Sequence, residues 1–222
     1  MHMHYFQLGR HDQDFLHARW VSLTSQYAPD RALIESLFNS IVEHYSESAR
    51  AYHNLSHIQS LLSLSESLLD KIQNRDAHYF AVWFHDVIYD TRRSDNEEKS
   101  VEFAAEALAR LGVPEPTIVV VREMILATKH HRADDLSWDM KAFLDIDTSI
   151  LGAPEDIYKE YSRAIRKEYS WVSDALYREG RTKILNDFLG RERIYQTEEI
   201  RAKFEMWARR NIAEEIRTLS AV

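Results

Sequence analysis

Apolar residues recur every three to four positions along most of the chain, which is the spacing that one buried face of an α-helix requires. A helix is expected to start at Ser94, because Glu97 three residues later completes a capping box. The β-branched run 117–121 resembles a strand by itself, but it continues without a break into residues 122–131, so we predict a helix there. The longest stripe follows a potential cap at Thr197 and consists of Ile200, Phe204, Trp207, Ala208, Ile212, Ile216 and Leu219.

The few glycines and prolines stand mostly where helices are expected to end or begin. They are Pro29, Gly112, Pro114, Pro116, Gly152, Pro154, Gly180 and Gly190. Together they divide the chain into about nine or ten helices. We therefore predict an all-α protein, a single compact multi-helix domain over residues 1–222. Its main motifs lie at about residues 50–151, and residues 153–222 are expected to form a C-terminal helical extension packed on this core.

Composition places the chain among water-soluble globular proteins, with 45% hydrophobic and 29% charged residues. No apolar run approaches the ~20 residues that cross a bilayer, and the amino terminus lacks the apolar region of a secretory signal. The sequence contains no cysteine, which excludes disulfides, thiol nucleophiles and thiolate metal sites. We expect a cytoplasmic protein that does not bind membranes.

The formal net charge of −8 argues against stable nucleic-acid binding, which needs a basic surface. A small anionic substrate is still compatible with this charge if cations gather in one cleft, and a bound metal ion would contribute to that field.

The segment Ala81–Asp90, read as a helix, is apolar on nearly every side and yet contains the adjacent residues His85 and Asp86. A buried carboxylate must be paired, hydrogen-bonded or bound to a metal. Consecutive helical residues differ by about 100° in direction, so both side chains can reach one ion only near the helix surface. A metal site would need further ligands, and a paired core histidine is the alternative.

One source of ligands is the pair His53 and His57, whose i, i+4 spacing is expected to place both on one helical face. The spacing is that of HExxH zinc proteases, but Asn54 stands where the glutamate base would be, which excludes that reading. Surface histidines near a helix start are the alternative.

A second source is the segment with Asp145 and Asp147. We expect Asp147 to face inward and Asp145 to face solvent or a rim. For Asp147, capping of a neighbouring helix or pairing with an arginine remains an alternative to metal binding. The neighbours at helical spacing are Phe143, Leu144, Ile150 and Leu151 for Asp147, but Lys141, Ala142, Thr148 and Ser149 for Asp145.

His130 and His131 stand at the end of a predicted helix, where the helix dipole alone favours histidine and lysine. They are also candidates for contact with a ligand. A phosphate needs cations or backbone donors, and Arg50 and Lys129 flank the candidate ligands in sequence, although most charged residues on helices are simply solvated.

Taken together, a histidine, an adjacent His-Asp pair and a distant aspartate in a helical chain resemble the HD superfamily of metal-dependent phosphohydrolases. The likeness runs from YHNLSHI through WFHDVIYD and HH to DIDTSIL, about residues 50 to 151. Within this superfamily the chain is most similar, over nearly its whole length, to the bacterial group labelled predicted metal-dependent HD phosphohydrolases. That group brings no defined substrate with it.

The resemblance implies a divalent metal ion (Mn, Fe, Co, Ni, Zn or Mg) whose ligands are His57, His85, Asp86 and Asp147. A second ion would require His130 and His131. It also implies that Arg181 contacts the substrate phosphate, as Arg50 and Lys129 are candidates to do.

Asp86 or Asp147 would orient the attacking water and take its proton. The stretch YHNLSH is also similar to the opening motif of cyclic-nucleotide phosphodiesterases, which makes His53 a candidate for protonating the leaving oxygen; His130 and His131 are the other candidates for this role.

The expected activity is hydrolysis of a phosphate ester by a metal-activated water, as in a phosphomonoesterase, a nucleotidase or a phosphodiesterase. The expected partner is a small phosphorylated substrate such as a nucleotide. The alternative is a catalytically silent metal- or nucleotide-binding regulatory module. The sequence is compatible with a monomer or a homodimer.

Overall fold

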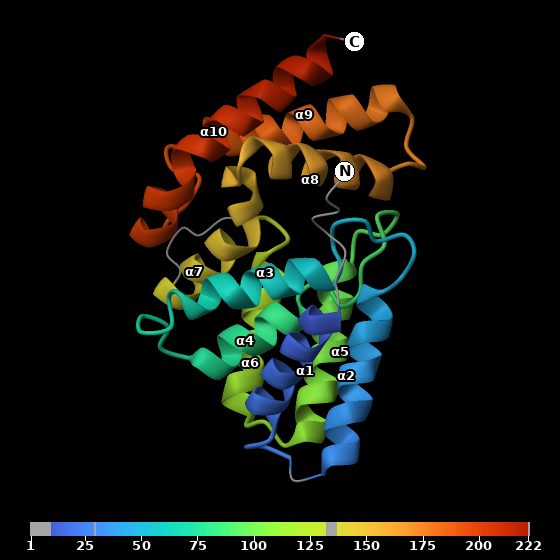
Figure 1. Cartoon of the computed structure of the whole chain (residues 1–222), viewed down its shortest axis with the longest axis vertical. Helices are drawn as coiled ribbons and strands as arrows, with labels where there is room; N and C mark the ends of the chain where they lie inside the picture. Colours follow the sequence, from blue (N-terminus) through green and yellow to red (C-terminus); the bar gives the residue numbers. More distant parts are fainter. Residues whose placement is uncertain (1–9, 29, 132–136, 222) are drawn as a thin grey trace. The chain divides into compact units, whose positions relative to one another are not determined.

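The computed structural model describes residues 10–28, 30–131 and 137–221. Over these residues the chain forms helices and no strand, so the all-α prediction is confirmed (Figure 1). The elements are α1 (Arg10–Thr24), α2 (Arg31–Tyr45), α3 (Leu55–Glu66), α4 (Arg75–Phe84), α5 (Asn96–Leu111), α6 (Glu115–Ala127), α7 (Trp138–Asp147), the 3-10 helix η1 (Thr148–Gly152), α8 (Glu155–Glu168), α9 (Asp174–Gly190) and α10 (Glu198–Ser220).

The internal contacts of the chain divide it into two compact units, Met1–Leu144 and Asp145–Val222. We call them unit 1 and unit 2. The boundary falls inside α7, between its second and its last turn. The expectation of a single domain over residues 1–222 stays a prediction.

In unit 1, α4 is the most deeply buried helix and packs against α3, α5 and α6. Its Trp83 and Phe84 are fully buried, and both meet the ring of Trp20 from α1 edge-on, with centroids 5.5 and 5.9 Å apart. The start of α4 is fixed by Asn74, whose side chain accepts a hydrogen bond from Ala77 N. Burial of these large rings holds α4 rigidly and therefore fixes the position of the residues at its carboxyl end.

The helix predicted over 117–131 is present as α6, which ends at Ala127, and its Ile118 and Val121 are buried. The capping box predicted at Ser94 is wrong by one residue, because α5 begins after Asp95. Gly112 ends α5 with φ 78°, a left-handed conformation that glycine adopts without strain.

Unit 2 consists of the end of α7, η1, α8, α9 and α10. Gly152 lies directly against α10, since a Cβ built on it would stand 2.5 Å from the backbone oxygen of Phe204. Asn211 of α10 donates to the carbonyls of Leu151 and Ala153. A residue without a side chain is therefore needed where η1 meets α10.

None of the described helices is both long enough and apolar enough to cross a lipid bilayer.

Candidate metal centre

His57 lies in the first turn of α3 and is buried. The helix is capped by Asn54, whose side chain accepts a hydrogen bond from Ser56 N at 2.8 Å. Asn54, which stands at the position of the glutamate in the HExxH motif, thus acts as an N-cap. His53 precedes the cap. The expectation that His53 and His57 share a helical face is therefore wrong, and only His57 is helical.

The His-Asp pair stands at the end of α4 instead of in the middle of a helix. His85 is the C-cap, and Asp86 lies in the turn that follows. The helix expected over Ala81–Asp90 therefore stops at Phe84. Because the chain turns here, the two adjacent side chains converge, and Oδ2 of Asp86 lies 3.1 Å from Nε2 of His85.

The tautomer of the neutral His85 ring follows from its contacts. Nδ1 lies 3.0 Å from the carbonyl oxygen of Val82. A carbonyl only accepts, so Nδ1 carries the proton and donates it. In the neutral ring Nε2 then holds a lone pair, and this is the arrangement that backbone carbonyls impose on metal-binding histidines.

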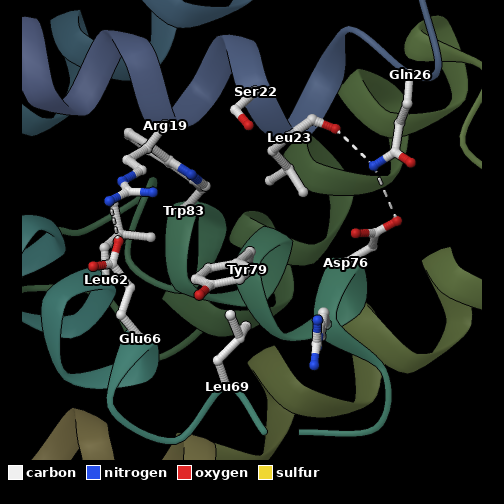
Figure 2. A pocket seen from close by; sticks show the side chains of 11 residues that line it. Arg19, Ser22, Leu23, Gln26, Leu62, Glu66, Leu69, Asp76, Tyr79 and Trp83 are labelled. Carbon is white, nitrogen blue, oxygen red and sulfur yellow. Dashed lines mark hydrogen bonds and ion pairs between the residues drawn. The ribbon is translucent and has the colours of Figure 1, made fainter.

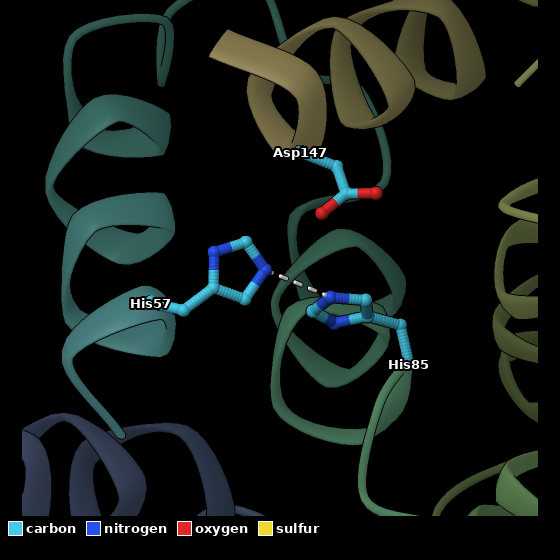
Figure 3. Close-up of side chains that lie close together, drawn as sticks. All are labelled: His57, His85 and Asp147. Carbon is cyan, nitrogen blue, oxygen red and sulfur yellow. Dashed lines mark hydrogen bonds between the residues drawn. The ribbon is translucent and has the colours of Figure 1, made fainter. Parts of the chain in front are cut away.

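The lone pair of His85 points toward His57. The two Nε2 atoms are 3.2 Å apart, and Figure 3 shows the two rings turned toward one another. Nε2 of His57 is also 4.0 Å from Oδ2 of Asp86. Two imidazole nitrogens and a carboxylate oxygen thus converge on one small volume.

Asp147 joins this group as the last residue of α7, a helix whose residues Trp138–Leu144 belong to unit 1. Phe143, one turn earlier on α7, meets the His85 ring edge-on with centroids 5.9 Å apart. Residues four apart share a helical face, so the face that carries Phe143 also brings Asp147 to His85. One ligand atom each from His57, His85 and Asp147 lie within 4.8 Å of one another (Figure 3).

The chemistry of these donors fits a divalent ion. Imidazole nitrogens with carboxylate oxygens suit first-row transition metals such as manganese, iron, cobalt, nickel and zinc. Both histidines are almost fully buried, whereas the side chain of Asp86 is 20% exposed. Asp147 is partly exposed as well. The group could hold a metal ion that is approached from the side of its carboxylates.

Asp145 is not at the surface, and the prediction that it faces solvent or a rim is wrong. It is 3% exposed and accepts hydrogen bonds from the backbone N–H of Gln196 and from the N–H and hydroxyl of Thr197. Thr197 is the N-cap of α10, as predicted, but Asp145 binds the open N–H groups at this helix start. Burial raises the pKa of Asp145, against the opposing effect of these hydrogen bonds.

Arg50 does not present its guanidinium to a substrate. Its side chain is 1% exposed, and it donates to the backbone carbonyls of His53 at 3.2 Å, Asp86 at 2.6 Å and Val87 at 2.9 Å. All three carbonyls belong to the segments that carry the predicted site residues. Arg50 is thus part of the framework beneath the site, and its prediction as a substrate ligand does not fit its contacts.

Lys129 contacts Glu98 and donates to Ser94 O at 3.0 Å. The Glu98 hydrogen bond raises the pKa of Lys129. His130 is exposed, and His131 lies half-buried in the same turn with φ 46°. Neither histidine is among the residues grouped around a potential ion in the described parts of the chain.

Arg181 lies in unit 2, where it is 8% exposed. Its guanidinium donates to both carboxylate oxygens of Glu215, at 2.9 and 3.2 Å, and its ring neighbour is Tyr161. Burial alone would raise the pKa of Glu215, but Arg181, with Tyr158 and Ser162, lowers it on balance. These contacts give Arg181 a structural role and leave its predicted substrate contact without support.

Aromatic rings that the sequence did not single out surround His53. The ring of Tyr89 stacks on it, with centroids 4.2 Å apart and an interplanar angle of 30°, and Tyr52 lies edge-on at 5.0 Å. The centroid of His53 is 5.9 Å from that of His57. Spacing could not reveal these contacts because Tyr52, His53 and Tyr89 lie outside the helices, where no periodicity applies.

A separate hollow of about 290 Å³ lies among α1, α3 and α4 of unit 1 (Figure 2). Its rim carries an ion pair between Arg19 and Glu66 at 2.6 Å, and Asp76 accepts a hydrogen bond from Gln26 at 3.2 Å. None of the predicted site residues lines it.

No protein-family model matches the chain, and no curated protein or solved structure matches it significantly. What the chain can do chemically must therefore follow from the geometry of its own side chains.

Proposed function

We propose that the chain is a metal-dependent phosphohydrolase that cleaves the ester of a small phosphorylated molecule. The observation that carries this proposal is the convergence of His57, His85 and Asp147, with Asp86 beside them. The four residues are also those that the resemblance to HD phosphohydrolases implies as ligands. A divalent ion held there would lower the pKa of a water molecule and offset negative charge on the phosphate.

The chain's own residues account for the proton transfers. Asp86 is a partly exposed carboxylate, as Asp147 is, so either of them can hold the attacking water and take its proton. The new bond joins the water oxygen to phosphorus while the bond from phosphorus to the leaving oxygen breaks. His53, next to His57, would give its proton to that oxygen, and the products are an alcohol and a phosphate.

Mixed nitrogen and oxygen ligands favour manganese, iron, cobalt, nickel or zinc over calcium. Magnesium, which prefers oxygen ligands, fits less well. One ion accounts for the grouped residues. Since Arg50 and Arg181 are committed to other protein groups, the positive charge that faces a phosphate would come mainly from the ion.

A catalytically silent metal- or nucleotide-binding module is the second candidate. It is favoured by the contacts of Arg50, Lys129 and Arg181, because each cation proposed to bind substrate already contacts a carbonyl or a carboxylate. Turnover separates this candidate from the hydrolase, whereas metal binding is common to both.

The test begins with metal analysis of the purified protein, followed by phosphatase and phosphodiesterase assays with Mn²⁺, Co²⁺, Ni²⁺ and Mg²⁺. We expect activity with at least one transition metal and its loss in His57→Ala and Asp86→Asn. His17→Ala is the matched control, because His17 is an exposed histidine that pairs with Glu35. Unchanged turnover in the His57 and Asp86 variants would refute the proposed site, and bound metal without any turnover would favour the silent module.

A further inference from the structure

Arg50 bonds to two separate segments of the chain at once. One segment, residues 51–54, precedes α3 and carries His53; the other, residues 85–88, follows α4 and carries Asp86. Nη1 donates to His53 O and to Asp86 O, while Nη2 donates to Val87 O. Arg50 and Asp86 are 36 residues apart in sequence, and the guanidinium of Arg50 connects the two segments.

The planar guanidinium is suited to this task. It offers five N–H donors in a fixed fork, and the carbonyls of Asp86 and Val87 belong to successive peptide groups on one side of it. A lysine ammonium is a point charge with three donors that cannot reproduce the fork. Because the Arg50 side chain is 1% exposed, any donor lost here would leave a buried carbonyl without its partner.

The rings around Arg50 extend this connection to the His53 side chain. The guanidinium lies over Tyr45 at 5.0 Å and over Tyr89 at 5.5 Å from the ring centroids. Tyr89 in turn stacks on His53 at 4.2 Å. Arg50 therefore holds His53 in two ways, through its carbonyl oxygen and through the Tyr89 ring.

We propose that Arg50 is a positioning residue that fixes the His53 segment against the Asp86–Val87 turn, and so sets the distance between the proton donor and the metal ligands. Its catalytic consequence rests on the proposed function. The connection between the two segments does not depend on that function, because the hydrogen bonds join them whether or not the site turns over a substrate.

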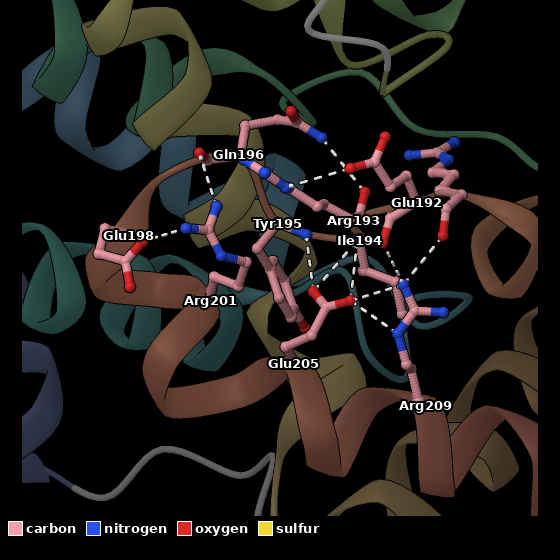
Figure 4. A network of polar contacts seen from close by, with 10 residues as sticks. Glu192, Arg193, Ile194, Tyr195, Gln196, Glu198, Arg201, Glu205 and Arg209 are labelled. Carbon is pink, nitrogen blue, oxygen red and sulfur yellow. Dashed lines mark hydrogen bonds and ion pairs between the residues drawn. The ribbon is translucent and has the colours of Figure 1, made fainter.

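Arg50→Lys tests the connection, and unit 2 contains a matched control. Arg209 donates to the carbonyls of Leu189, near the end of α9, and of Arg191 and Glu192 in the loop that follows. Figure 4 shows Arg209 beside Glu192 and Glu205. Arg209→Lys makes the same chemical change in a residue with the same kind of contacts, but in a loop that carries none of the proposed site residues.

Hydrogen exchange followed by mass spectrometry gives a readout that needs no activity. We expect Arg50→Lys to speed exchange both in peptides that cover residues 51–54 and in peptides that cover residues 85–88. Arg209→Lys should speed exchange only around residues 189–192. A change confined to one of the two unit 1 segments, or to neither, would overturn the connection.

Kinetics with two leaving groups tests the effect on His53. A nitrophenolate leaves without being protonated, whereas an alkoxide needs a proton. We expect Arg50→Lys to lower kcat for an alkyl phosphate by about 10- to 100-fold, because displacement of a reacting group by about 1 Å has effects of that size. His53→Gln should show the same preference for the aryl ester, and the double variant should be no slower than the slower single variant. Equal losses on both esters, or multiplied losses in the double variant, would mean that Arg50 supports the fold only.

Tyr89→Leu provides a second variant if Arg50→Lys does not fold. It removes the half-buried ring between Arg50 and His53 while the carbonyl contacts of Arg50 stay, and we expect a smaller loss with the same leaving-group selectivity. An equal loss on both esters would contradict the role of the ring. If the wild-type protein cleaves neither ester with any metal, the proposed function fails, and hydrogen exchange alone decides on Arg50.

Discussion

Protonation of His78 is expected to destabilise unit 1 as the pH falls below neutral. His78 lies in α4, is 0% exposed and has Ser65 as its hydrogen-bond partner, with 2.8 Å between Nε2 and the hydroxyl oxygen. The Ser65 hydroxyl donates its single proton to the carbonyl of Leu61, so Nε2 of His78 donates to the hydroxyl. Nδ1 is then the unprotonated nitrogen, and it has no hydrogen-bond partner among the described residues.

A proton on Nδ1 would place a charged, unpaired N–H in the core, which is why burial lowers the pKa of His78 to about 4 from its ordinary value of 6.5. The nearby charge of Asp139 opposes this shift but does not cancel it. Between these two values the unfolded chain binds a proton that the folded chain does not. Stability is therefore lost as the pH falls through this window, by up to about 3 kcal/mol for a difference of about 2.5 pH units.

The measurement is urea unfolding at several pH values from 7.5 to about 4.5, followed by tryptophan fluorescence, since Trp20 and Trp83 are fully buried in the same unit. His78→Gln keeps a donor for Ser65 and removes the titrating ring. We expect the free energy of unfolding of the wild type to fall with pH more steeply than that of the variant, by a difference that approaches about 3 kcal/mol at the acidic end.

His130→Gln is the control, because it removes a histidine from an exposed position. Comparison of the variant with the wild type also removes the contribution of the carboxylates to the pH dependence of stability. Among these carboxylates are Asp145, whose pKa is raised, and Glu215, whose pKa is lowered. Parallel curves for the wild type and His78→Gln would refute the reasoning.

Three further predictions concern α7 and unit 2. Asp145→Ala should destabilise the metal-free protein by about 1–3 kcal/mol, because the start of α10 loses a charged acceptor, and should keep the rise in Tm on adding Mn²⁺. Asp147→Ala should abolish that rise; the reverse pattern would contradict both assignments. Gly152→Ala should lower the free energy of unfolding by about 1–3 kcal/mol, because the added Cβ meets the backbone of α10. Gly180→Ala has open space around it and should raise the free energy of unfolding by about 0.5–1 kcal/mol; urea unfolding measures both. Glu215→Gln should destabilise by about 3–5 kcal/mol, because a buried guanidinium loses its charged partner; a higher KM at unchanged stability would instead restore a substrate role for that pair.

The helices were predictable where a stripe of apolar residues runs without interruption. The run 117–121 is an example, because its continuation into Met124 and Ile125 gives one buried face over the length of α6. Asp147 lies near the buried histidines for the same reason, since Phe143 shares its face of α7 and contacts His85. In both cases the deciding neighbours are three or four residues away.

The errors arise where a distant residue decides the local structure. Nothing in Ala81–Asp90 marks a helix end, yet α4 stops before His85, and the turn that follows is bonded to Arg50 36 residues earlier. Asp145 has polar neighbours on its own helix, which suggested exposure, but its carboxylate binds the N–H of Thr197 52 residues later. Helical periodicity contains no information about such contacts.

The carbonyl contacts of Arg50 and Arg209 also separate two kinds of information in the sequence. Every residue has a carbonyl group, so the shape of the bonded loop is encoded by the distant arginine and only weakly by the residues of the loop itself. Evolution can then change the side chains of such a loop without losing its shape. Residue 86 is the useful case: its backbone is held by Arg50, which leaves its side chain to be selected for chemistry alone.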